Sequence, residues 1–184
     1  TNSNHQLQAL NSSIGKPKVE VLASRLQDIN PQCKINIVYD FVSECNAQDI
    51  IEDVDFCFDT IDSLSAKCLI FKICTEKKIG LLVSGSSAGK KNPSLVSIKD
   101  MARTEHDKLL ARMRKKMKSD KILPPYKQKK IFTDCVSSSE ESLFSSEEIC
   151  ERKSCTEGLG SSSCVTGAFG LHAASYVLDY LVKK

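Results

Sequence analysis

Two aspartates stand three positions apart directly after an apolar run, in the segment Asp59–Ser63 (DTIDS). The run before them, Val54–Phe58, predicts a buried strand. Ligands of open α/β sheets bind at the carboxyl ends of parallel strands, which is where this pair is expected. Asp62 is suited to holding Mg²⁺ against the phosphates of a nucleotide. The alternative is that Asp62 or Ser63 only caps the following helix.

A second polar group lies at the start of the chain. Lys18 follows Gly15 at the beginning of a predicted helix, where free amides and the positive helix end attract anions. Asn2, His5 and Gln6 belong to a polar run with no structural task visible in the sequence. Taken alone, that run also fits a frayed terminus.

A basic segment provides the third candidate site. Ten Lys or Arg and one Asp occupy positions 108–130. An anionic partner, nucleic acid first, is one interpretation, and a solvated helix face is the other. Tyr126 and Phe132 are aromatic residues that could stack an unpaired base of RNA. The candidate contacts within the predicted helix are Arg112, Arg114, Lys115, Lys116 and Lys118.

Composition limits the class of protein. The chain has 184 residues, of which 41% are hydrophobic and 27% charged, so collagen-like and wholly disordered classes are excluded. It is long enough for one domain with a core. Nine cysteines without a Cys-x-x-Cys pair argue against a zinc site and favour a reducing compartment. No run of 18 apolar residues occurs, so we expect no membrane span.

The elements that must position these residues follow from periodicity. Alternating strands and helices in the first hundred residues indicate βαβ units and a mostly parallel α/β sheet. We expect an α/β core over 1–100, a basic helix and a mobile Ser/Glu-rich loop over 101–163, and a C-terminal helix over 164–184. The expected elements are a helix at 15–30, a strand at 34–42, a short helix at 47–52, a strand at 54–58, a helix at 63–77, strands at 79–83 and 95–98, a helix at 107–120, a loop at 137–148 and a helix at 164–181.

Three of these motifs, in this order, resemble a known family. They are Asn2–Gln6 (NSNHQ), Gly15–Glu20 (GKPKVE) and Asp59–Asp62 (DTID). Together they resemble the adenylating core of the ubiquitin-activating-like (ThiF/MoeB) enzymes. Within that family they look most like the tRNA threonylcarbamoyladenosine dehydratases, the TcdA/CsdL group. The likeness extends over essentially the whole chain and implies a Rossmann-like sheet in a single adenylating domain, 1–184.

The resemblance implies a reaction and roles. Family members use ATP and Mg²⁺ to adenylate a carboxylate, here that of the threonylcarbamoyl group on a tRNA adenosine, and ring closure then expels AMP. Asn2 and Lys18 would contact the triphosphate, Gln6 would support that segment, and Asp62 would hold Mg²⁺. His5 stands where the family has an arginine that reaches the ATP of the opposite subunit, so a homodimer is implied. The basic segment would bind tRNA.

Other features of the resemblance leave alternatives open. The family's glycine-rich nucleotide loop precedes the point where this chain begins, so we expect the first nucleotide-binding unit to be missing. The loop Ser84–Lys90 has serines where the family has consecutive glycines. A catalytically impaired homologue that binds tRNA or a partner, or an adenylyltransferase for another carboxylate, therefore remains an alternative. Cys135 and Cys155 lie in segments where the family also has cysteines, and some relatives are linked to sulfur transfer, which suggests sulfur-transfer partners. A plain structural role is the preferred interpretation of these cysteines. The cytoplasm is the expected location, with mitochondrial association as a second option.

Overall fold

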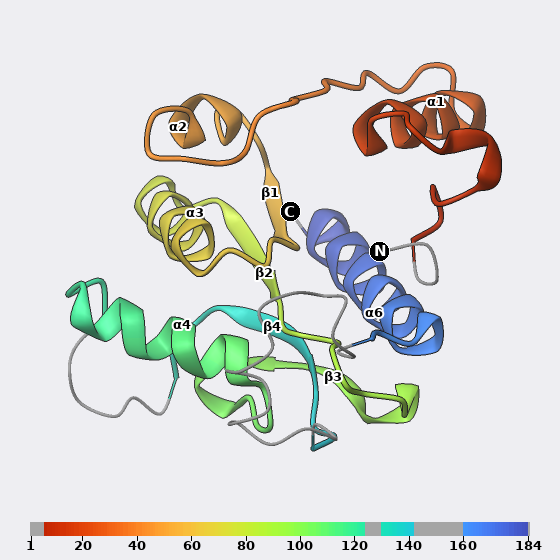
Figure 1. Cartoon of the computed structure of the whole chain (residues 1–184). Helices are drawn as coiled ribbons and strands as arrows, with labels where there is room; N and C mark the ends of the chain where they lie inside the picture. Colours follow the sequence, from red (N-terminus) through yellow and green to blue (C-terminus); the bar gives the residue numbers. More distant parts are fainter. Residues whose placement is uncertain (1–5, 124–129, 142–159, 184) are drawn as a thin grey trace.

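A four-stranded sheet with the order β1-β2-β4-β3 organises the chain. The computed structural model describes residues 6–123, 130–141 and 160–183, and Figure 1 shows their arrangement. The elements are a 3₁₀ turn at Asn11–Ser13, α1 (Lys18–Ile29), α2 (Ala47–Ile50), β1 (Phe56–Asp59), α3 (Leu64–Lys77), β2 (Gly80–Ser84), a 3₁₀ turn at Pro93–Leu95, β3 (Val96–Asp100), a 3₁₀ turn at Met101–Arg103, α4 (Lys108–Ser119), β4 (Asp134–Ser138) and α6 (Ser163–Val182).

The expected α/β class is confirmed by the strand pairing. β1 pairs with β2 in parallel, and β2 pairs with β4 in parallel. β3 runs antiparallel to β4 at the edge of the sheet. The sheet is therefore open and mixed, and the carboxyl ends of β1, β2 and β4 meet at one edge, where open α/β sheets bind their ligands.

Helices cover both faces of this sheet. α3 and α4 pack on one face, where Cys68, Phe71 and Met113 form a core with Val83 and Cys135. α6 covers the other face and packs against β3 and β4, as Figure 1 shows. The bounds of α3, α4 and α6 agree with the predicted helices to within about two residues.

One strand of the sheet is absent from the sequence prediction. β4 lies in the region 101–163, where the sequence predicts only a basic helix and a loop. Ser137 and Ser138, expected in that loop, are buried at the end of β4. Cys135 and Val136 are the two apolar residues of β4. They pack into cores on opposite faces of the sheet, because side chains alternate along a strand. Residues 142–148 of the expected loop lie outside the described residues.

The predicted strand at 34–42 is wrong. The segment has no sheet pairing in the described structure, and most of its side chains are exposed, with Phe41 95% accessible. Val42, at its end, is half-buried against the core that includes Ala47. A strand is stabilised by a partner, and this segment crosses from α1 toward α2, apart from the sheet (Figure 1). A hydrogen bond of 2.7 Å from the Tyr39 hydroxyl to Glu20 links the segment to α1. α1 itself has no buried residue.

Two further findings concern the described residues as a set. Among the described helices, none is long and apolar enough to cross a membrane. The seven cysteines in the described residues are all free thiols.

The start of β2 is packed too closely for a side chain at Gly80. A Cβ there would lie 2.6 Å from ring atoms of both Phe56 and Tyr180. We expect Gly80→Ala to lower the free energy of unfolding by about 1–3 kcal/mol, as overpacking does. Gly170→Ala is the matched control, because Gly170 is helical with open space around it; it should raise stability by about 0.5–1 kcal/mol. Urea unfolding measures both, and equal effects would contradict the packing shown here.

Candidate active site

Asp62 lies at the carboxyl edge of the sheet with its carboxylate available. It is exposed, and no hydrogen bond or ion pair joins it to another described residue. The cap of α3 is Ser63, whose hydroxyl accepts from the amide of Ala66 at 3.5 Å. The cap alternative therefore applies to Ser63, and Asp62 remains suited to binding a cation.

A buried ion pair holds the loop that carries Asp62. Lys67 Nζ lies 3.1 Å from Asp59 Oδ2, and both residues are about 1% exposed. The same ammonium donates to the carbonyl of Ser84 at 2.8 Å. The other oxygen of Asp59 accepts from the amide of Ile61 at 2.9 Å. Lys67 thus ties the carboxyl ends of β1 and β2 to the first turns of α3.

Sequence reasoning missed this pair, although a signal was present. Lys67 occupies a position on α3 whose helical neighbours Ile70, Phe71 and Cys74 are all buried. A lysine at an apolar position of a helix needs a buried anion, because an isolated buried charge is strongly unfavourable. Asp59, the last residue of β1, was the available candidate.

A second clamp fixes the loop after β2. Asp107 Oδ2 accepts from the amide of Ser86 at 2.9 Å, and its Oδ1 accepts from Leu110 at 2.9 Å as the cap of α4. A Cβ on Gly85 would collide with this carboxylate. Gly85 is thus required for contact with Asp107, and the clamp fastens the start of α4 to the carboxyl end of β2.

Lys90 fastens the same loop to β4. Its Nζ donates to the carbonyl of Ser138, the last residue of β4, at 2.7 Å. Burial lowers the pKa of Lys90, although the carboxylates of Asp107 and Glu140 oppose that shift. Gly89, with a φ of 70°, takes the left-handed conformation that favours glycine, and its amide donates to Gly160 at 3.1 Å.

Of the candidate residues near the start of the chain, Lys18 is not brought to Asp62. Lys18 is exposed at the first position of α1, which lies apart from β1 in Figure 1. Gln6 accepts a hydrogen bond of 2.6 Å from Gln8. Asn2 and His5 lie outside the described residues.

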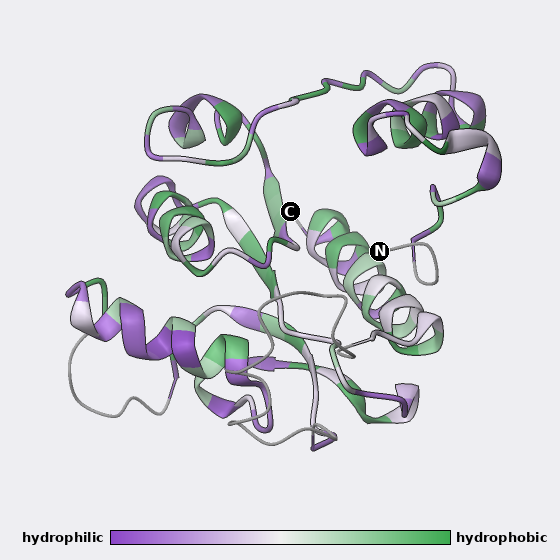
Figure 2. Ribbon diagram, in the orientation of Figure 1, coloured by the Kyte–Doolittle hydropathy of each residue, from purple (hydrophilic) through white to green (hydrophobic). Residues whose placement is uncertain are grey.

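The basic helix α4 has residues of two kinds. Arg114 donates to the carbonyl of Met101 at 2.9 Å, and Lys116 pairs with Asp120 at 2.9 Å. Arg112 and Lys115 are exposed, and Lys118 is partly exposed. Figure 2 shows the strongly hydrophilic character of this helix. α4 therefore has an exposed basic face, but Arg114 binds the 3₁₀ turn that contains Met101.

Cys135 lacks the features of a reactive thiol, and no preformed metal site is evident in the described part of the chain. Cys135 is fully buried in β4, and burial raises the pKa of its thiol, which disfavours the reactive thiolate. Cys155 lies outside the described residues. Across 6–123, 130–141 and 160–183, no group of three His, Cys, Asp or Glu side chains could hold a metal ion.

The buried pair offers a direct test of this geometry. Lys67→Met leaves the Asp59 carboxylate buried without its cation, so we expect a loss of about 3–5 kcal/mol in unfolding free energy. Asp59→Asn with Lys67→Met should lose less than the two single changes combined, with a coupling of about 1 kcal/mol or more. Denaturant titration of the four proteins measures the coupling, and additive losses would show that the pair does not act as a unit.

Comparison with known proteins agrees with this architecture. The model of the ThiF family matches residues 1–184. The chain is 34% identical to a tRNA threonylcarbamoyladenosine dehydratase of Haemophilus influenzae over 189 residues, which covers 100% of this chain and 72% of the relative. It is 33% identical to the Escherichia coli protein of the same name over 196 residues, with 100% and 73% covered.

Solved structures give the same result. The crystal structure of E. coli tRNA N6-threonylcarbamoyladenosine dehydratase, TcdA, in complex with ATP matches with a TM-score of 0.87 and 32% identity over 99% of this chain and 70% of that one. The same enzyme in complex with AMP matches with a TM-score of 0.86 and 32% identity, over 99% and 71% of the two chains. This chain belongs to the ThiF family, and within it is similar over its full length to the tRNA threonylcarbamoyladenosine dehydratases.

Proposed function

We propose that the chain is an ATP-dependent tRNA threonylcarbamoyladenosine dehydratase. The observation that carries the proposal is the exposed Asp62 carboxylate, unpartnered among the described residues, at the carboxyl end of β1. The buried Asp59–Lys67 pair below it holds the strand end in place. The full-length likeness to dehydratases, one of them solved with ATP, supplies the substrate class.

The reaction has two steps. The carboxylate of the threonylcarbamoyl group attacks the α-phosphate of ATP, which forms an acyl-adenylate and releases pyrophosphate. A nucleophilic atom within the same group then attacks the activated carbonyl carbon, the ring closes, and AMP leaves. The net change in the nucleoside is the loss of water. Positioning and charge neutralisation dominate such chemistry, so amides and cations matter more than a protein nucleophile.

Magnesium and the nucleotide make different demands on the chain. Mg²⁺ characteristically binds one or two carboxylates together with substrate phosphates and water. An exposed aspartate without a preformed ligand cluster in the described residues fits that requirement. Bound there, the metal would neutralise phosphate charge. We assign Asp62 to the metal, Asn2 and Lys18 to the triphosphate, and Gln6 to the support of that segment.

The proposal includes an assembly. α1, which begins at Lys18, lies apart from β1 in Figure 1, so a nucleotide site that uses both Lys18 and Asp62 requires α1 to approach the sheet, or a second copy to contribute. We propose a homodimer in which residue 5 faces the ATP of the opposite subunit. A histidine there is shorter than arginine and mostly uncharged near neutral pH. The cytoplasm is the proposed location, and sulfur-transfer proteins are proposed as further partners.

The tRNA is assigned to the outer face of α4. Arg112 and Lys115 are exposed on this helix, and its first turn is fastened to the active edge through Asp107 and Ser86. Phosphate contacts from such a face would orient the tRNA without reading its sequence. Arg114 and Lys116 have partners on the protein, so their contribution is expected to be smaller.

AMP release tests the proposed reaction. With ATP, Mg²⁺ and threonylcarbamoylated tRNA, Asp62→Asn should lower AMP formation about 100-fold or more, because a charge that stabilises the transition state is removed. Asp53→Asn is the matched control, since Asp53 is exposed, lies away from the strand end and has a left-handed φ that asparagine accepts. Its AMP formation should be unchanged. Equal activity of Asp62→Asn and the unsubstituted chain would remove Asp62 from the site.

The same assay separates the enzyme from a binding module. The alternative is favoured by two sequence features, the histidine at position 5 where the family has arginine and the serines of the Ser84–Lys90 loop where the family has consecutive glycines. Activity that appears only in His5→Arg would identify an impaired enzyme on an intact scaffold. No AMP from either protein, with tRNA still bound, would establish the binding module.

The salt dependence of tRNA binding tests the assigned face. Arg112→Glu with Lys115→Glu should weaken binding and lower the slope of log K against log salt by about 1 for each phosphate that α4 no longer neutralises. Lys34→Glu with Lys183→Glu makes the same change of net charge at exposed lysines elsewhere. If both pairs of substitutions lower the slope equally, the effect is one of overall charge, and α4 does not bind the tRNA.

A further inference from the structure

Phe132 is held in an unfavourable conformation on the surface. Its side chain is 87% exposed, and its φ is 61°. Bulky residues rarely adopt the left-handed region, where glycine is favoured. An exposed ring in that conformation brings no packing that would offset the cost. Backbone outliers that persist in this way point to a functional role for the residue.

The backbone around Phe132 is fixed by Asp100, the last residue of β3. The Asp100 carboxylate accepts from the amide of Phe132 at 2.8 Å and from that of Ile131 at 3.0 Å. On the other side, the amide of Met101 donates to the carbonyl of Thr133 at 2.8 Å. The ring is therefore presented from a rigid support. A rigid aromatic contact loses little conformational entropy on binding.

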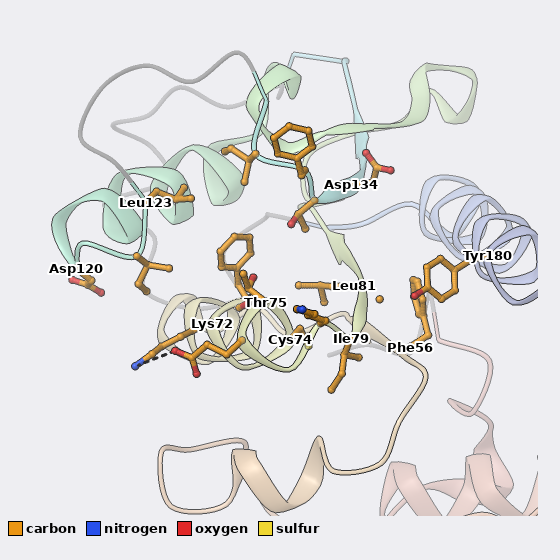
Figure 3. A pocket seen from close by; sticks show the side chains of 18 of the residues that line it. Phe56, Lys72, Cys74, Thr75, Ile79, Leu81, Asp120, Leu123, Asp134 and Tyr180 are labelled. Carbon is orange, nitrogen blue, oxygen red and sulfur yellow. Dashed lines mark hydrogen bonds and ion pairs between the residues drawn. The ribbon is translucent and has the colours of Figure 1, made fainter. Parts of the chain in front are cut away.

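Two hollows meet at Phe132. One, of about 860 Å³, is lined by Phe56, Tyr176 and Tyr180 at the amino ends of β1 and β2, and Figure 3 shows it. Burial, and then the hydrogen bond to Asp134, raise the pKa of Tyr176 to about 12, so its phenol stays uncharged. Charged side chains of both signs also line this hollow, which are Lys72, Lys78, Lys121, Glu76, Asp120 and Asp134. The other, of about 770 Å³, contains three cationic and three carboxylate side chains, which are Lys99, Arg103, Lys130, Asp100, Glu105 and Asp134.

Together, the exposed ring of Phe132 and the polar lining of the second hollow favour a flat, aromatic ligand with polar edges. The charges of the second hollow balance, so it does not attract anions strongly by itself. Two of its carboxylates already accept hydrogen bonds, Asp100 from backbone amides and Asp134 from Tyr176. An unpaired nucleobase can stack on the exposed ring while its edge reaches polar groups, and the adjacent phosphate can reach Arg103 or Lys130.

Phe132 and the two hollows lie near the end of α4, the helix to which the tRNA is assigned. The two hollows and the ring of Phe132 lie at the amino ends of the parallel strands, opposite the edge that carries Asp62. α4 begins beside Asp107 at the Asp62 edge, and Asp120, directly after it, lines the first hollow. Its 12 residues span about 18 Å. One RNA lying along α4 would contact both edges.

We propose that Phe132 is a stacking platform for an unpaired tRNA base other than the adenosine that reacts. The inference rests on the proposed function, because it assumes that tRNA is the ligand. Stacking is insensitive to salt, whereas phosphate contacts are not. Phe132 should therefore raise the affinity for tRNA by the same factor at every salt concentration. The slope of log K against log salt should depend on α4 alone.

The test compares three substitutions by fluorescence anisotropy with a labelled anticodon stem-loop, over a series of salt concentrations. Phe132→Gly should weaken binding about tenfold with an unchanged salt slope. Its melting temperature should equal or exceed that of the unsubstituted chain, because glycine relieves the left-handed strain. Phe132→Tyr should bind normally. Phe41→Ala, which removes another exposed phenylalanine, is the control and should also bind normally.

The outcomes separate this inference from the proposed function. Unchanged affinity of Phe132→Gly overturns the stacking platform and leaves the dehydratase proposal intact. Equal weakening with a blunt RNA duplex, which offers no unpaired base, also overturns it. If the unsubstituted chain binds no RNA, tRNA as the substrate is overturned as well. A peptide partner would be indicated if the substitution changed protein binding and left RNA binding unaltered, which again contradicts the platform.

Discussion

The buried contact between Lys67 and Asp59 is the constraint on which the candidate active edge depends. Removing two charges from water is unfavourable, and the pair is stable because both groups make further hydrogen bonds. Lys67 reaches a carboxylate on β1 and a carbonyl on β2, while Asp59 also holds the amide of Ile61. One interaction thus joins two strand ends and the start of α3. Asp62, three residues after Asp59, takes its position from that junction.

The two edges of the sheet are built for different tasks. At the carboxyl edge, Lys67, Lys90 and Asp107 bind backbone groups at or just after the ends of β2 and β4. Asp62 has no such contact among the described residues and is exposed. At the amino edge, aromatic rings gather around the start of β1 and β2 (Figure 3). α4 runs between these edges with its charged face outward (Figure 2). The fold therefore separates a polar edge, which carries Asp62, from an aromatic edge.

The sequence predicts those parts whose signal is local. Ser63 begins α3 and Asp107 begins α4 because capping depends on neighbouring amides. The predicted strand at 34–42 is wrong because an alternating pattern does not provide a partner, and β4 escapes prediction because pairing on both sides buries its serines. Lys90 and Asp100 act through contacts 48 and 32 residues away in sequence, which no local pattern encodes. The contact of Lys67 with Asp59 spans only 8 residues, and its signal is a lysine at an apolar position of α3.

A diffraction experiment with ATP and Mn²⁺, which replaces Mg²⁺ and gives an anomalous signal, tests the central claim most directly. The account predicts a manganese peak within coordination distance of the Asp62 carboxylate, with the phosphates at the carboxyl edge of β1 and β2. A metal–nucleotide complex bound at the aromatic edge, or a manganese site that excludes Asp62, would contradict it.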